Sequence, residues 1–65
     1  MFIVAELQTN NGITSCTPEV FGEFLAAESR YHDILHYAAA SQVEIHGAIM
    51  FTNAGSFVKS EYYEH

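Results

Sequence analysis

The residues with the clearest chemical potential are Glu28, His32 and His36, which follow one another at intervals of four. In a helix, this spacing places a carboxylate and two imidazoles on one side, like the two-histidine half of many zinc sites. A closed tetrahedral site needs a fourth ligand, for which the chain offers Cys16, His46 and His65. Nothing in the spacing selects one of them. Metal binding through Glu28, His32 and His36 is therefore only one hypothesis, and we expect no cofactor.

Two other interpretations of Glu28 and His32 compete with metal binding. At ~100° per residue, both fall inside the apolar stripe of a helix that runs through this segment. If that helix is straight, the two side chains form a buried or half-buried hydrogen-bonded pair. If it bends or breaks near Ser29, they lie at a solvated edge. The stripe is defined by Phe21, Phe24, Leu25, Leu35 and Ala39.

Catalysis has little support in the residues. Cys16 is the only cysteine, and its place just before an expected helix is typical of a small half-buried residue. The four glycines are scattered and do not form a phosphate-binding loop. A fold of this size with one helical layer also has little room for a ligand cleft. We therefore expect a protein that is not an enzyme.

The elements that position these residues begin with a hairpin. Residues 2–9 alternate as a strand whose buried face carries Ile3, Ala5 and Leu7. Asn11 and Gly12 tolerate the positive φ of a type I′ turn, so they predict a tight reversal. Residues 13–16 would be a short returning strand. Thr17, Pro18 and Glu19 have the residue types of a helix start, and the helical pattern continues to residue 41 as one helix or two.

A second hairpin follows the helix. Residues 43–51 alternate as a strand with Val43, Ile45, Ile49 and Phe51 on its apolar face. Gly47 lies within that face, which indicates a bulge or a close approach by another element, for which we expect the helix. Residues 52–56 form a turn and residues 57–63 form the partner strand. The sequence therefore predicts an α+β fold of order β-β-α-β-β: a small antiparallel sheet of three to four strands with one long or broken helical segment on one face.

Charge excludes several classes of function. Eight carboxylates face two cations, Arg30 and Lys59, which gives a formal net charge of −6. Two cations cannot neutralise nucleic-acid phosphates or dock the chain on an anionic membrane. The chain is 49% hydrophobic with nine Phe and Tyr residues, so it is not a disordered acidic tail.

Length and cysteine content limit the architecture. Sixty-five residues allow one compact domain, residues 1–65, with a marginal core. A single Cys cannot form an internal disulfide, which favours a reducing cytoplasm. The first residues lack the basic region of a signal peptide, and no apolar run is long enough to span a membrane.

These observations favour a small acidic interaction module that binds a basic surface of a partner protein as an inhibitor or adaptor. A sharper version is nucleic-acid mimicry, as in small phage-encoded proteins that block nucleic-acid-binding enzymes. An alternative is a homodimer, because the second hairpin ends in an exposed edge and the core is marginal. Acidic and tyrosine side chains suited to an interface supply the candidate partner-binding residues: Glu19, Glu23, Tyr37, Glu61, Tyr62, Tyr63 and Glu64.

Overall fold

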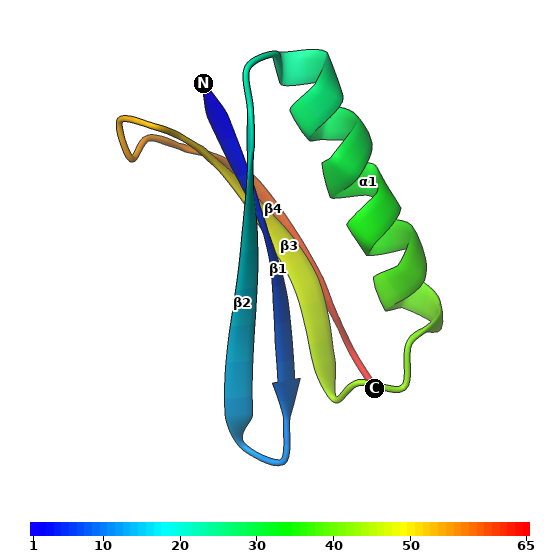
Figure 1. Ribbon diagram of the computed structural model, residues 1–65. Helices are drawn as coiled ribbons and strands as arrows, with labels where there is room; N and C mark the ends of the chain where they lie inside the picture. Colours follow the sequence, from blue (N-terminus) through cyan, green and yellow to red (C-terminus); the bar gives the residue numbers. More distant parts are fainter.

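A computed structural model describes all 65 residues and contains four strands and one helix. The strands form one antiparallel sheet in the order β2-β1-β3-β4, and α1 lies across one face of it (Figure 1). This arrangement confirms the predicted α+β fold of order β-β-α-β-β. The elements are β1 (Phe2–Asn10), β2 (Ile13–Phe21), α1 (Phe24–Ala40), β3 (Ile45–Thr52) and β4 (Phe57–Glu64).

Both hairpins turn where the sequence predicts. Asn11 and Gly12 have φ angles of 55° and 78°, so both carry the positive φ that a type I′ turn requires. Between β3 and β4, Gly55 has a φ of 85°, and the Thr52 hydroxyl accepts hydrogen bonds from the backbone N–H groups of Ala54 and Ser56. The β3–β4 pairing shifts register at Met50 and Phe51, which marks a bulge near this turn.

The predicted helix start at Thr17, Pro18 and Glu19 is wrong, because these residues belong to β2. That strand is nine residues long and pairs with β1 along its whole length, so it is not the short arm expected. Pro18 is tolerated because β2 is an outer strand, where a missing N–H need not break a ladder bond. The helix begins at Phe24 and continues for 17 residues, so it is one helix without a break near Ser29.

The buried side of α1 also differs from the predicted apolar stripe. Leu25 was placed in the stripe but is 75% exposed, whereas Leu35 is 7% exposed. The true stripe is rotated from the predicted one by roughly 85° at ~100° per residue. The predicted stripe is wrong because Phe24, Leu25 and Ala39 are exposed on α1, and Phe21 ends β2 and is not helical. The buried residues of α1 are Ala27, Tyr31, Ile34, Leu35 and Ala38.

The helix covers the face of the sheet that the alternation pattern predicted to be less apolar. Val4 and Met50 are fully buried beneath α1, and Ala48 joins them in the core. Ile3, Ala5 and Leu7 of β1, predicted to be buried, point to the opposite face, where Ala5 is buried and Ile3 and Leu7 are half-buried. Gly47 also lies on that opposite face, so the helix does not approach it as predicted.

Candidate functional site

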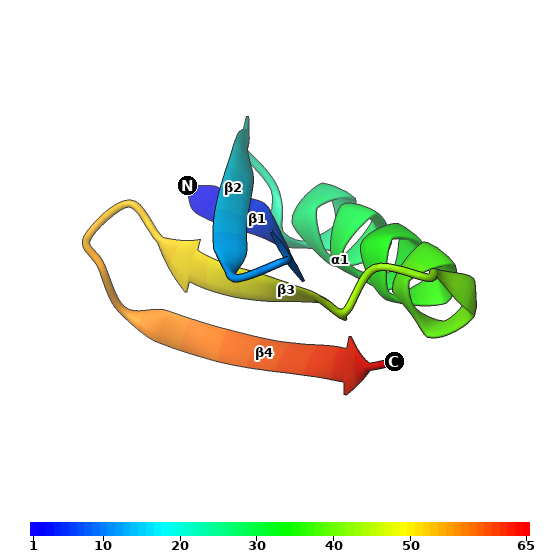
Figure 2. The same cartoon turned by 90° about the horizontal axis from the view of Figure 1, so that it is seen from below.

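One face of the sheet is covered by no other element of the chain. Figure 2 shows α1 packed against one side of the sheet. The residues of this open face follow from the pairing register, because paired residues point the same way. We define the open face as alternate residues 3–9 of β1, 14–20 of β2 and 45–51 of β3, with Phe57, Ser60, Tyr62 and Glu64 of β4.

The open face is apolar and almost free of charge. Its central strands present Ile3, Leu7 and Ile49, all half-buried, and its outer strands present Val20 and Tyr62, each 62% exposed. Of the eight carboxylates in the chain, only that of Glu64 lies on this face. Arg30 and Lys59 both lie on the helix side of the sheet, where they form ion pairs. Uncovered apolar faces rimmed by polar residues are typical of interaction sites.

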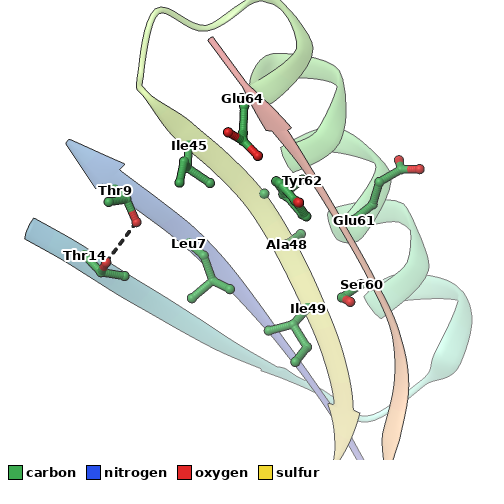
Figure 3. Close-up of a pocket in the computed structure, with 11 residues that line it drawn as sticks. Leu7, Thr9, Thr14, Ile45, Ala48, Ile49, Ser60, Glu61, Tyr62 and Glu64 are labelled. Carbon is green, nitrogen blue, oxygen red and sulfur yellow. Dashed lines mark hydrogen bonds between the residues drawn. The ribbon is translucent and has the colours of Figure 1, made fainter. Parts of the chain in front are cut away.

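A groove of about 400 Å³ runs along the open face between β1 and β4 (Figure 3). Leu7, Ile45 and Ile49 form its apolar floor and Tyr62 flanks it. At one rim, the hydroxyls of Thr9 and Thr14 lie 2.8 Å apart and hydrogen-bond to each other. The groove therefore offers mainly hydrocarbon and ring surface to an incoming group, with few polar contacts.

Gly47 shapes this groove by bringing β3 and β4 close together. A Cβ at this position would lie 2.6 Å from Tyr62 Cβ and would overlap the carbonyl oxygen of Glu61. The sequence signal of a close approach was therefore right, but the approaching element is β4. Because Gly47 has no side chain, the Tyr62 backbone can pack over it and hold the ring beside the groove.

The total accessible surface is ordinary for a chain of this mass, but few residues are buried. The accessible surface is 4186 Å², close to the ~4,200 Å² expected for a compact monomer of this mass. Only 11 of 65 residues are buried, in a chain that is 49% hydrophobic. Of the nine exposed large hydrophobic side chains, Val20, Phe57 and Tyr62 lie on the open face, beside the half-buried Ile3, Leu7, Ile45, Ile49 and Phe51.

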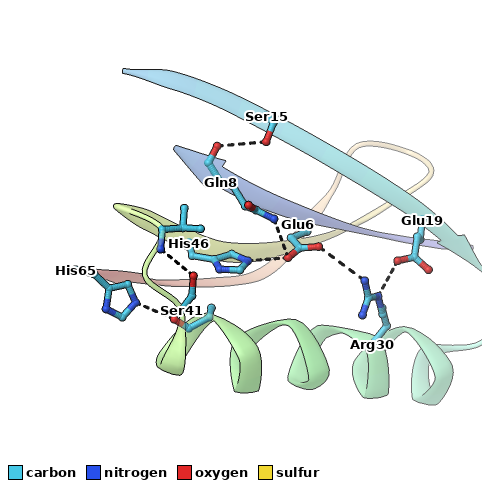
Figure 4. Close-up of polar contacts among 10 residues, drawn as sticks. Glu6, Gln8, Ser15, Glu19, Arg30, Ser41, His46 and His65 are labelled. Atoms are coloured by element: carbon cyan, nitrogen blue, oxygen red, sulfur yellow. Dashed lines mark hydrogen bonds and ion pairs between the residues drawn. The ribbon is translucent and has the colours of Figure 1, made fainter. Parts of the chain in front are cut away.

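Polar groups are concentrated between the sheet and α1 (Figure 4). Arg30 Nε donates to Glu19 Oε1 at 2.7 Å, and Arg30 Nη2 lies 3.8 Å from Glu6 Oε1. The hydrogen bond to Glu19 raises the pKa of Arg30 above its ordinary value. Glu6 Oε2 lies 2.7 Å from Nε2 of the buried His46 and accepts a hydrogen bond from Gln8 Nε2 at 3.2 Å. These contacts explain how a face with ionisable residues can pack beneath a helix.

The predicted partner-binding residues do not form one surface. Tyr62 and Glu64 lie together on the open face and line the groove. The side chain of Glu61 points away from Leu7 and Ile49 in Figure 3. The others are distributed over the rest of the molecule: Tyr63 beside Glu61 on the helix side of β4, Tyr37 on the outer surface of α1, Glu23 directly before α1, and Glu19 beneath Arg30.

Glu28, His32 and His36 do not gather into a metal-binding group. No cluster of three or more His, Cys, Asp or Glu side chains in the structure has a spacing that could hold a metal ion. Glu28 is half-buried and pairs with Lys59, with Oε2 and Nζ 2.6 Å apart. His32 and His36 are exposed on α1. The Glu28–His32 pair considered from the sequence is replaced by this Glu28–Lys59 pair.

Comparison with known proteins supplies no family for this chain. No family model, curated protein or solved structure matches it significantly. The helix α1 is neither long nor apolar enough to cross a membrane. The open face is therefore the feature of this chain that bears on its function.

Proposed function

We propose that this chain is a non-catalytic association module that uses its open face to bind an apolar, uncharged protein surface. The observation that carries the proposal is the contrast between the two sides of the sheet. One side is covered by α1 and holds both cations, whereas the other is apolar, uncovered and carries only the carboxylate of Glu64. A partner with matching chemistry gains hydrophobic burial there without leaving a charge desolvated.

This proposal places the partner on a different surface from the one expected from charge alone. A basic surface would find only one carboxylate on the open face, so charge complementarity favours an uncharged partner there. The groove beside Tyr62 adds a concave apolar feature of the kind that accepts an anchoring side chain. A cytoplasmic location, expected from the single free Cys16, is consistent with this function.

Site-specific photo-crosslinking in cells that express the chain tests this function. A photoreactive phenylalanine analogue replaces Tyr62, which is 62% exposed on the open face. The matched control carries the same analogue at Tyr37, which is 68% exposed on the outer surface of α1. We expect protein adducts from position 62 and few from position 37. Equal yields from both positions, or no adduct from position 62, would contradict the proposal.

A second candidate function is binding a basic protein through the helix side, as an inhibitor or adaptor would. It is favoured by carboxylates that have no cation within ion-pair distance: Glu23, Asp33, Glu44 and Glu61. Binding of this kind weakens steeply with ionic strength, whereas binding through the open face changes little. A salt series on a captured complex separates the two functions, because only one of them predicts loss of the complex at high salt.

A further inference from the structure

From the open face we infer the identity of the partner: a second copy of this chain, packed face to face to form a sandwich of two sheets with the helices outside. This inference rests on the proposed function, because it names the occupant of the same surface. Two sheets pack with their inner faces ~10 Å apart and their side chains interdigitated. The open face has the composition of such an inner face, with Leu7, Ile49 and Phe51 along its central strands.

The charge distribution allows two copies to meet on this surface. Each copy carries a net charge of −6, which would oppose association if the acids lay at the contact. All the carboxylates except that of Glu64 lie outside the open face. Glu64 is near the end of an outer strand, so it falls at the rim of the contact, where water reaches it. The face-to-face contact is thus the arrangement that keeps the charges of the two copies far apart.

The area of the face is sufficient for a dimer. Four strands ~4.8 Å apart and eight residues long, at ~3.4 Å per residue, give a face of about 500 Å². The longest dimensions of the molecule, 33 and 20 Å, accommodate this face. Two such faces bury about 1,000 Å² in total, which is the lower limit for a specific protein interface.

A two-fold contact between open faces places an outer strand of each copy over the groove side of the other. Tyr62 projects from β4 beside a hollow of about 400 Å³ above Gly47. With a two-fold axis parallel to the strands, β4 of one copy lies over β2 of the other. By the pairing register, Cys16 and Pro18 of β2 then lie over the partner's Tyr62 and Ser60 beside the groove, and Val20 lies over the partner's Phe57. The same axis places Glu64 over the Thr14 end of β2 and away from the partner's Glu64.

The test is the mass of the purified chain in solution, measured by sedimentation equilibrium from about 1 to about 200 µM. Tyr62→Lys places a cation in the contact, and Tyr37→Lys places the same cation at a similarly exposed tyrosine on α1. We expect wild type and Tyr37→Lys to approach twice the 7.3 kDa monomer mass and Tyr62→Lys to stay at 7.3 kDa. Circular dichroism checks that each variant is folded. If Tyr62→Lys does not fold, Val20→Lys on the outer strand β2 repeats the test.

Cys16 provides a second readout without any substitution. It is the only cysteine, is exposed, and lies on the open face opposite Leu7. We expect its rate of modification by a thiol reagent to fall as the protein concentration rises through the dimerisation range.

The outcomes separate this inference from the proposed function. A wild type that is monomeric at every concentration overturns the inference. A dimer that persists in both Tyr62→Lys and Val20→Lys also overturns it, because such a dimer must form through another surface, for example the β4 edge. In the crosslinking experiment, an adduct at position 62 with twice the monomer mass supports a second copy. A position-62 adduct of another mass leaves the proposed function standing and overturns the dimer.

Discussion

Lys59 and Glu28 connect the outer strand β4 to the helix, with Nζ and Oε2 2.6 Å apart. Both side chains are about one-third exposed, so the pair lies at the border of the core. Lys59 Nζ also lies 4.8 Å from the centre of the Tyr31 ring, where a cation–π contact adds to the pair. Within this cluster, the hydrogen bond from Lys59 holds the pKa of Glu28 below its usual range.

The Glu28–Lys59 pair predicts that the stability of the fold falls as the pH is lowered below the unfolded pKa of Glu28. A carboxyl whose folded pKa is lowered stabilises the fold above its unfolded pKa of ~4.3, and this contribution disappears as the pH falls through the folded pKa. We expect Glu28→Gln to melt below wild type at pH 7, with a difference that shrinks towards zero below pH ~4. Thermal melts across this range measure it. Glu23→Gln, at an exposed acid without an ion pair, is the control, and an equal difference at pH 7 and pH 3 would contradict the prediction.

Two leucines on the same helix test the orientation of α1. Leu35 is 7% exposed and packs in the core, whereas Leu25 is 75% exposed. We expect Leu35→Ala to lower the free energy of unfolding by about 3 kcal/mol, because it removes buried methyl groups and leaves a cavity. Leu25→Ala should change it by less than about 0.5 kcal/mol. Urea denaturation of the two variants measures both values. Similar losses would instead support the buried stripe predicted from the sequence.

The strengths and errors of the sequence prediction have physical causes. Asn11 and Gly12 specify their turn locally, because few residues accept positive φ. Thr17, Pro18 and Glu19 were misassigned because a hydroxyl, a proline and an acid occur both at helix starts and on outer strands. Long-range pairing with β1 decided between these possibilities, with Pro18 opposite Ala5. No local pattern contains that information.

The open face could have been partly foreseen. Strand β1 is apolar on both sides, with Val4 on one and Leu7 on the other, and a single helix covers only one face of a sheet. Which face it would cover was not predictable from alternation. Glu6 and His46 made one face look solvated, yet they pair with each other beneath the helix. Only the three-dimensional structure shows that Glu6 and His46 hydrogen-bond to each other, through Nε2 of His46, while its buried Nδ1 has no partner.

The buried hydroxyl of Tyr31 predicts that the fold loses stability at alkaline pH. Burial raises the pKa of its hydroxyl, with a further contribution from the carboxylate of Glu61, and Lys59 partly opposes this rise. A group with a raised folded pKa stabilises the fold below its unfolded pKa, here ~10, and this contribution is lost as the pH rises through the folded value. We expect wild type to lose more stability than Tyr31→Phe between pH 9 and 11. Denaturant melts measure the difference. Tyr37→Phe, on the outer surface of α1, should follow wild type, and parallel curves for all three proteins would exclude this role.

Any side chain at Gly47 is expected to destabilise the fold, because β4 packs directly against this residue. An added Cβ would lie 2.6 Å from Tyr62 Cβ and would overlap the Glu61 carbonyl, so β4 must shift outwards. We expect Gly47→Ala to lower the free energy of unfolding by about 1–3 kcal/mol, the usual cost of overpacking. Gly22→Ala is the matched control, because no atom lies within 4 Å of its added Cβ and its φ is not positive. Chemical denaturation compares the two variants. Equal stability would show that β3 and β4 are not in close contact at Gly47.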